Sequence, residues 1–452
     1  MVGKLIARVI LVRLQLLAER IYPESQCGFR AERSTIDMVF SVRQLQEKCR
    51  EQQMPLYIAF VDLTKAFDLV SRSGLLVLLQ KVGFPPKLFS IIRSFHSGTN
   101  ATVQFHGSSS EPFTILSGVK QGCVLAPTLF GMFFSLLLKY AFGSSTEGVY
   151  LHTRSDGGLF KPARLKSKRK VRKVTIRDLL FADDAAIVAH SEQHLQTLMN
   201  NFSKACQDFG LTISKSKTKV IGQGTTGPPE IVLDGTDIEV VHDFVYLGSH
   251  ISSNACLSVE IESRIGKAFA TFARLSARVW SNPKLNISTK IAVYSSCVLS
   301  TLLYGSETWA TTKKQEAKLN SFHFRCLRRI LGISWMDRIT NAEVLKRTRL
   351  TTLPTILKKR RLRWLGHVSR MKDGRIPKDI LYGELASGAR SVGRPLLRYR
   401  DVIKRDMSEL NLSNWESLAA DRAKWRALLH KQLLAAEEKT ITTAKRKKSS
   451  NT

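Results

Sequence analysis

Two short stretches decide the fold of this chain: Phe60–Asp68, which reads FVDLTKAFD, and Leu180–Ala186, which reads LFADDAA. Each places carboxylates at the end of an apolar run, and the second sets Asp183 and Asp184 side by side at a predicted hairpin tip. Ionised carboxylates this close repel one another, and burying them unpaired costs roughly several kcal/mol. The pattern predicts a hard divalent cation between them. Magnesium binds carboxylates and substrate phosphates, and two ions can clamp both oxygens of a phosphoryl transfer.

The order of the predicted elements brings these carboxylates together. A buried strand over 55–61 carries Asp62 at its end, and strands over 174–182 and 185–190 flank Asp183. On one antiparallel sheet, the end of the first strand and the tip of the hairpin can meet. A lone Asp-Asp pair is usually a surface turn, but the apolar flanks and the matching Asp62 favour a catalytic cluster. The sequence therefore predicts a polymerase palm.

The charge of the chain indicates the class of substrate. Among its 452 residues, 70 are Lys or Arg and 37 are Asp or Glu, which gives a net charge of +33. Such an excess is typical of proteins that bind the phosphate backbone of nucleic acids with salt-dependent affinity. Charge alone leaves a ribosomal or chromatin-associated structural protein as an alternative. A hydrophobic content of 43% argues against wholesale disorder.

Cysteine usage and hydropathy indicate an intracellular protein. The seven cysteines form no CxxC pair and no Cys/His cluster with zinc-ligand spacing, so we expect reduced thiols. The longest apolar run, from Val124 to Leu138, contains Pro127 and is too short for a membrane span. The N-terminal stretch lacks a small-residue cleavage pattern, which argues against a signal peptide. We expect the nucleus or cytoplasm, and no membrane partner.

Six segments, in this order along residues 4–250, resemble the motifs of reverse transcriptases of the non-LTR, LINE-type retrotransposon family. They are the fingers motif QCGFRAERST at 26–35, motif A at Phe60–Asp68, motif B SGVKQGCVLAP at 117–127, motif C FADD at 181–184, motif D GLTISKSKTK at 210–219, and the primer-grip motif E FVYLG at 244–248. The resemblance implies an RNA-directed DNA polymerase whose partners are an RNA template, a DNA primer and dNTPs.

The fold implied is α+β: a right-hand polymerase with fingers and an antiparallel palm sheet, then a helical thumb and a helical, basic C-terminal region. An amphipathic helix is expected over 4–20, with Leu5, Val9, Val12 and Leu16 at helical spacing. The expected divisions are 1–54 partial fingers, 55–250 palm with motifs A to E, 251–335 thumb, 336–440 basic region and 441–452 disordered tail.

The resemblance assigns the metal site to the acidic cluster. Asp62, Asp183 and Asp184 are the expected catalytic residues and ligands of two Mg²⁺ ions, with Mn²⁺ as an alternative. Leu63 is expected to offer a backbone carbonyl to the same ions.

The nucleotide pocket is expected to involve four further residues. Phe67 stands where this family keeps an aromatic gate against a ribose 2′-hydroxyl, and a role as an ordinary core residue is the alternative. Gln121 and Gly122 are expected to line the pocket, since glycine permits close backbone approach. Lys217 is the expected proton donor to the departing pyrophosphate.

Nucleic-acid contacts are expected in three places. Arg30 and Arg33 are expected to contact the template, and a structural salt-bridge role is the open alternative. The primer-grip residues are Tyr246, Leu247 and Gly248. The segment 357–367 interleaves cations with an indole, which suits phosphate contact and stacking, although Trp364 fits a core position equally well. Its expected phosphate contacts are Lys358, Lys359, Arg360, Arg361 and Arg363.

The chain departs from the family pattern at three points. We find no counterpart of the apurinic-type endonuclease domain or of the fingers strand that precedes residue 4 in the family. Ser214 also stands where motif D usually has Asn. The alternative to a polymerase is therefore a catalytically inactive, retrotransposon-derived fragment that binds nucleic acid.

Overall fold

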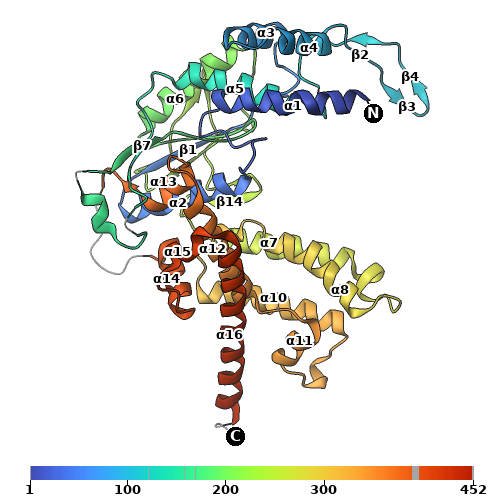
Figure 1. Cartoon of the computed structure of the whole chain (residues 1–452), viewed down its shortest axis with the longest axis vertical. Helices are drawn as coiled ribbons and strands as arrows, with labels where there is room; N and C mark the ends of the chain where they lie inside the picture. Colours follow the sequence, from blue (N-terminus) through green and yellow to red (C-terminus); the bar gives the residue numbers. More distant parts are fainter. Residues whose placement is uncertain (1, 121, 157, 168, 389–395, 450–452) are drawn as a thin grey trace.

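The computed structural model describes residues 2–120, 122–156, 158–167, 169–388 and 396–449 (Figure 1). Its centre is a four-stranded antiparallel sheet in the order β10-β1-β9-β8. The strands are β1 (Leu56–Val61), β8 (Asp178–Phe181), β9 (Asp184–Ala189) and β10 (Lys219–Gln223). In the register, Val61 pairs with Ala185, which places the residue after β1 level with the start of β9. The predicted palm sheet is confirmed.

Both faces of the sheet are covered, which explains why β1 reads as a continuous apolar run. Ala59 and Val61 face a core formed with α1 (Val2–Ile21), α5 (Ala126–Phe142) and α6 (Glu192–Asp208). Ile58 and Phe60 alternate with them and face a second core. That core includes α2 (Thr35–Glu51), α13 (Ile376–Tyr382) and the sheet β15-β6-β7. Its strands are β6 (Val149–Thr153), β7 (Arg172–Ile176) and β15 (Glu384–Leu385).

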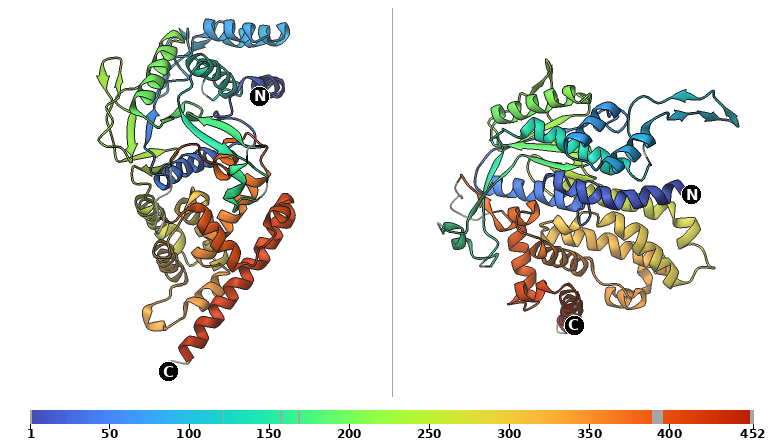
Figure 2. Two further views of the ribbon diagram at one scale, coloured as in Figure 1. Left: turned by 90° about the vertical axis from the view of Figure 1, so that its left-hand side faces the viewer. Right: turned by 45° about the horizontal axis from the view of Figure 1, so that its top comes forward.

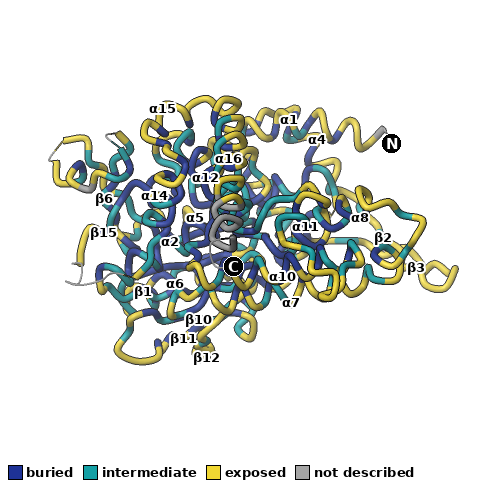
Figure 3. Tube along the Cα trace, turned by 90° about the horizontal axis from the view of Figure 1, so that it is seen from below, coloured by how far each residue is buried: buried dark blue, intermediate teal, exposed yellow. Residues whose placement is uncertain are grey.

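The helix α1 forms where the sequence predicts, but its buried face differs from the expected one. The apolar residues Leu5, Val9, Val12 and Leu16 are 63–70% exposed. A second apolar stripe packs on the core instead, and it consists of Ala7, Ile10, Leu14 and Ala18. Figure 3 shows that the N-terminal part of α1 is mostly exposed.

After β1 the chain forms two helices and an arm, which lie at the top of the molecule, and the arm projects to the upper right (Figure 1). The helices are α3 (Arg72–Lys81) and α4 (Pro86–His96). The arm pairs β2 (Asn100–Ala101) with β5 (Phe113–Thr114) and β3 (Gln104–Phe105) with β4 (Ser108–Ser109), so the strands expected around Gly107 are present but short. The other small elements are η1 (Pro162–Lys166), β11 (Val232–Leu233), β12 (Thr236–Asp237), β13 (Asp243–Tyr246) and β14 (Ser249–Ser252).

The thumb is helical, as predicted, and its core extends past the expected boundary at 335. Its helices are α7 (Ser258–Arg274), α8 (Ile287–Val293), α9 (Ser300–Leu302), α10 (Lys313–Leu331) and α11 (Asn341–Thr348). Short turns of π or 3-10 helix interrupt them at η2 (Ser276–Trp280), η3 (Tyr294–Leu299), η4 (Ser306–Thr308) and η5 (Trp335–Asp337). Leu353 and Leu357 complete the same core.

The C-terminal region packs on both the thumb and the palm. Its helices are α12 (Leu353–Arg370), α14 (Tyr399–Glu409), α15 (Trp415–Ala420) and α16 (Arg422–Ser449). Residues 441–449 continue α16, so the disordered tail expected there is a helix that reaches away from the body (Figure 2). No helix in the described part of the chain is both long and apolar enough to cross a membrane.

Candidate active site and nucleic-acid surfaces

The three predicted catalytic residues lie at one edge of the palm sheet. Asp62 directly follows β1, whose last residue Val61 pairs with Ala185 of β9. Asp184 begins β9 and pairs with Phe181 across the hairpin, and Asp183 lies in the two-residue turn. The sheet register thus brings together carboxylates that are more than 100 residues apart in the sequence.

The pKa values of the hairpin carboxyls indicate mutual repulsion. Burial, together with the charges of Asp183 and Asp62, raises the pKa of Asp184 to about 6. Burial also raises the pKa of Asp183, and the Asp62 charge adds to this effect. Three negative charges in this space are unfavourable without a counter-charge, which a divalent cation would provide.

The donor set fits a hard cation in its chemistry. Asp62 Oδ2 is shielded from solvent and accepts no hydrogen bond from any described residue. Its charged neighbour is the largely exposed Lys217, whose Nζ lies 3.4 Å away. Within the described ranges, no three His, Cys, Asp or Glu side chains are gathered closely enough to hold a metal ion. Metal ligation by Asp62, Asp183, Asp184 and the Leu63 carbonyl therefore stays a prediction.

The backbone around Leu63 is consistent with the ligand role expected for its carbonyl. Leu63 forms an isolated antiparallel bridge with Ile213 of motif D. The bonds of this bridge run from Ser214 N to Asp62 O (2.9 Å) and from Thr64 N to Thr212 O (2.8 Å). Because both bonds use residues beside Leu63, the bridge does not consume its carbonyl. Motif D therefore orders the end of β1, including the Asp62 backbone.

A buried glutamine holds the catalytic hairpin, and sequence reasoning assigned it no role. The Gln26 side chain donates to Ala182 O (2.9 Å) and accepts from both Ala182 N (2.9 Å) and Gly28 N (2.8 Å). Ala182 has a φ of +59°, a left-handed conformation that non-glycine residues seldom adopt. A Cβ on Gly28 would lie 2.1 Å from Ala182 N. The amide-glycine pairing in the fingers motif is the sequence signal that could have identified this clamp.

Phe67 lies among aromatic rings near the acidic cluster. Its ring stacks on Phe130 of α5, with centroids 4.2 Å apart, and meets the exposed Phe29 edge-on at 6.2 Å. Phe29 also lies 6.5 Å from Phe181 of the hairpin. The half-buried Phe67 ring is therefore fixed in orientation, and both the gate and the core readings remain open.

The motif B loop lies beside motif A, and one of its two predicted residues can be described. Gln121 lies outside the described residues. Gly122 has a φ of +80° and open space where a Cβ would stand, so its backbone is accessible to a ligand. Gly118, with a φ of +84°, sits so close to motif A that a Cβ would lie 2.7 Å from Asp68 O. Arg72 fastens the loop by donating to Gly118 O (3.0 Å).

The primer-grip hairpin turns through Leu247 and Gly248, which both have positive φ, as a tight two-residue hairpin turn requires. The thumb holds this turn: Tyr304 Oη donates to Leu247 O (2.9 Å), and Arg264 donates to Gly248 O. Tyr246 is only 2% exposed, and its hydroxyl donates to Leu179 O. The Tyr246 side chain is therefore not available to nucleic acid, and a primer contact through the turn itself stays a prediction.

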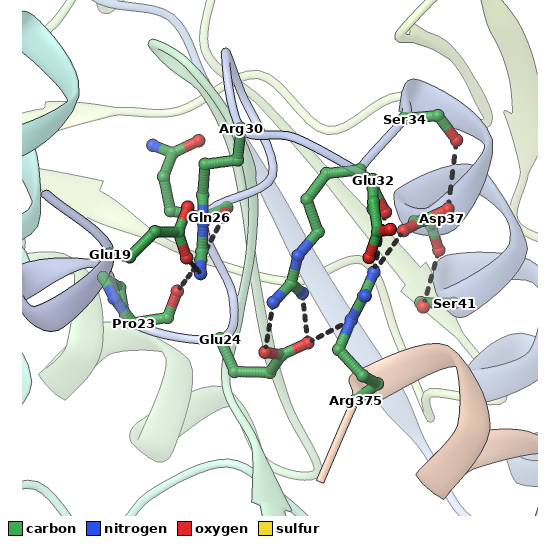
Figure 4. A network of polar contacts seen from close by, with 11 residues as sticks. Glu19, Pro23, Glu24, Gln26, Arg30, Glu32, Ser34, Asp37, Ser41 and Arg375 are labelled. Atoms are coloured by element: carbon green, nitrogen blue, oxygen red, sulfur yellow. Dashed lines mark hydrogen bonds and ion pairs between the residues drawn. The ribbon is translucent and has the colours of Figure 1, made fainter. Parts of the chain in front are cut away.

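Arg30 and Arg33 take part in intramolecular ion pairs, and Figure 4 shows the Arg30 side chain beside Glu19. Arg30 donates to Glu19 (2.7 Å), to Pro23 O and to Gln26 O. Arg33 donates to Glu24 (2.7 Å). These contacts are the salt-bridge alternative left open by the sequence, and a template contact stays a prediction for both residues.

The predicted cation patch on α12 divides into two groups. Arg361 is fully buried and bonds Asp406 (2.8 Å), which corrects the prediction that it contacts phosphate. Arg360 pairs with Glu307 (3.0 Å), and Lys358 pairs with Glu409. Lys359 and Arg363 form no ion pair with any described residue. Trp364, 8% exposed, packs in the core against Phe40, as the alternative reading had it.

Comparisons with known proteins identify relatives over most of the chain. The chain is 28% identical to the RNA-directed DNA polymerase from mobile element jockey of Drosophila melanogaster over 356 residues, covering 75% of this chain and 36% of that protein. It is 25% identical over 269 residues to an uncharacterised transposon-derived protein of Caenorhabditis elegans, covering 57% of this chain and 96% of that one. The chain therefore spans about a third of the jockey protein.

Among solved structures, apo telomerase from Candida tropicalis truncated from its C-terminal domain aligns with a TM-score of 0.39 and 14% identity, covering 55% of this chain and 44% of that one. The sequence profile described as reverse transcriptase (RNA-dependent DNA polymerase) matches residues 1–251. Because this match covers more than half of the 452 residues, the chain belongs to the reverse transcriptase family.

Proposed function

We propose that this chain adds deoxynucleotides to the 3′-hydroxyl of a DNA primer, using RNA as the template. The observation that carries the proposal is that Asp62, Asp183 and Asp184 lie at one edge of the palm sheet, where the Asp62 charge helps to raise the pKa values of Asp183 and Asp184. Two bound Mg²⁺ ions would neutralise this charge and polarise the reacting phosphate. The carboxylates would hold these ions, assisted by the Leu63 carbonyl.

The surrounding residues supply position and proton transfer. The fixed ring of Phe67 would stand against the sugar, and the open backbone at Gly122 would approach the nucleotide. Gln121 is proposed for the same pocket from its place in motif B. The exposed ammonium of Lys217, held beside Asp62, can move toward the departing pyrophosphate and release a proton to it. The turn at Leu247 and Gly248, held by the thumb, would support the primer end.

Primer extension on an RNA template with dNTPs and Mg²⁺ tests the proposal. The variant Asp183→Asn should lose incorporation by about 10³-fold or more, because it removes a ligand charge needed in the transition state. Its binding to primer–template should persist. The matched control is Asp237→Asn, an exposed carboxylate in β12, which should retain wild-type incorporation.

Retained synthesis in Asp183→Asn would contradict the mechanism. One observation favours a second candidate, a nucleic-acid-binding relic: the Lys217 ammonium already neutralises part of the Asp62 charge without a metal. Tight, salt-sensitive binding with no incorporation by the wild-type chain would support that candidate.

A further inference from the structure

A cleft of about 1280 Å³ separates the fingers segment from the C-terminal helices. One side is formed by α1 and residues 22–37, and the other by α12 and α16. Residues from α12 recur along one helical face at positions 360, 363, 367 and 370, and α16 adds residues 422 and 426. Two helices that are distant in sequence thus present their side chains to one space.

Cations dominate the lining of this cleft. It contains nine Lys or Arg residues and four Asp or Glu residues. Four of the nine form ion pairs, namely Arg30, Arg33, Arg360 and Arg375. The other five have no ion-pair partner in the part of the chain that the structure describes: Arg363, Arg370, Lys372, Arg422 and Arg426. The cleft therefore carries positive charge that the protein itself does not neutralise.

These cations repel one another across the two helices. The pKa of Arg363 is lowered first by burial and then by the charges of Arg426, Arg360 and Arg422. The pKa of Arg370 is lowered by burial and by Arg422. Gathering like charges is unfavourable unless an anion with several charges occupies the space, and a phosphodiester backbone is such an anion.

The cleft opens beside the candidate active site. Phe29 lines it, is 47% exposed, and contacts both Phe67 of motif A and Phe181 of the catalytic hairpin. The primer-grip turn, in contrast, is held by the thumb residue Tyr304. If this turn supports the primer end, as proposed above, the copied duplex lies on the thumb side, and a strand on the fingers side has not yet been copied. An exposed ring at the entrance suits stacking on an unpaired base.

We propose that this cleft binds the uncopied, single-stranded part of the RNA template, with Arg363, Arg422 and Arg426 contacting its phosphates. The inference rests on the proposed polymerase function for the identity of the strand. It assigns a nucleic-acid role to α16, where the motifs of the family gave none.

Two primer–template duplexes test the proposal, one blunt and one with a single-stranded 5′ template extension of about 12 nucleotides. Their dissociation constants are measured over a salt series without divalent metal. For the wild-type chain, the extension should tighten binding and steepen the salt dependence. In Arg363→Gln/Arg422→Gln/Arg426→Gln, most of this gain should vanish, and the slope of log K against log salt should fall by about 2, from three lost phosphate contacts at ~0.7 each.

The matched control is Lys81→Gln/Lys87→Gln/Lys204→Gln, which removes three exposed cations from α3, α4 and α6, outside the cleft. It should retain the gain from the extension. An equal loss in both variants, or a retained gain in the arginine variant, would overturn the proposal. The proposal would also be overturned if polyglutamate competed with the single-stranded template extension as effectively as RNA of equal length, because the cleft would then be a site for an acidic polypeptide.

Primer extension by the wild-type chain, run in parallel, separates the two proposals. If the wild-type chain extends the primer but the single-stranded segment does not tighten its binding, the cleft assignment is overturned and the polymerase function stands. If the single-stranded segment tightens binding by the wild-type chain but not by the arginine variant, and the wild-type chain extends no primer, the result supports a strand-binding cleft and contradicts the polymerase function.

Discussion

At the scale of single residues, the catalytic hairpin depends on a neutral amide as much as on its acids. Ala182 precedes the two carboxylates with a φ of +59°, and Gln26 bonds both its N–H and its carbonyl. Gln26 has no exposed surface, so water cannot replace these bonds. A residue 36 positions before Asp62 thus fixes the direction in which Asp183 and Asp184 project.

Replacing Gln26 by Met should loosen this geometry while roughly preserving side-chain volume. The variant leaves the buried N–H groups of Ala182 and Gly28 and the Ala182 carbonyl without their hydrogen-bond partner. We expect the Mg²⁺ concentration for half-maximal primer extension to rise by about 10-fold or more, as for other residues that orient metal ligands. The measurement is a Mg²⁺ titration of the initial rate at saturating primer–template.

Gln46→Met is the control for this prediction. Gln46 is also a buried glutamine, but it bonds Ser252 O of β14, away from the carboxylates. Its replacement should lower stability without changing the Mg²⁺ requirement. Equal shifts in the two variants would mean that Gln26 supports the fold in general and does not orient the hairpin.

The role of a residue could be predicted from the sequence when its signal lies within its own segment, and not when its partners lie far away along the chain. Asp62 and Asp183 stand out because charges at the ends of apolar runs are anomalous within their own segments. The burial of Arg361 and Tyr246 was missed because the first stands in a basic run and the second was assigned through its motif alone. Their partners, Asp406 and the Leu179 carbonyl, lie 45 and 67 residues away and can be identified only in the fold.

At the scale of elements, helical periodicity predicts that a helix forms but not always which face it buries. In α1, two apolar stripes keep helical spacing, and the smaller residues of one stripe pack closely on α5. Close approach also governs the pair α12 and α16. Gly366 has no side chain, so Trp425 can lie where a Cβ would be 2.4 Å from its Nε1.

Gly366→Ala should therefore separate α16 from α12. Trp425 is 1% exposed and donates to Leu362 O, so it cannot move aside freely. We expect a loss of about 1–3 kcal/mol in the free energy of unfolding, as for other overpacked cores. Thermal unfolding followed by circular dichroism measures it.

The exposed Gly266 of α7 is the matched control, because nothing lies within 4 Å of its Cβ position. There, alanine should stabilise the helix by up to about 1 kcal/mol. A neutral Gly366→Ala would show that the two helices are not held at this distance.

At the scale of the whole molecule, the chain returns from the thumb to close the palm. β15 pairs with β6, and Lys48 of α2 donates to Gly383 O (2.7 Å). Arg375 forms ion pairs with Glu24 (3.0 Å) and with the buried Asp37 (2.9 Å), which joins α13 to the fingers segment (Figure 4). The division at 335, drawn where basic composition begins, misses this closure because ion pairs across more than 300 residues leave no local sequence signal.

If this closure holds the fingers in place, Arg375→Met should destabilise the chain by about 3 kcal/mol, because it leaves the Asp37 charge buried and unpaired. Adding Asp37→Asn should recover part of the loss by removing that charge. The exposed pair Arg347–Glu343 offers a control, since Arg347→Met should cost less than about 1 kcal/mol. Urea unfolding followed by circular dichroism compares the three variants. An Arg375 effect as small as that of Arg347 would mean that the palm and fingers hold their arrangement without the returning segment.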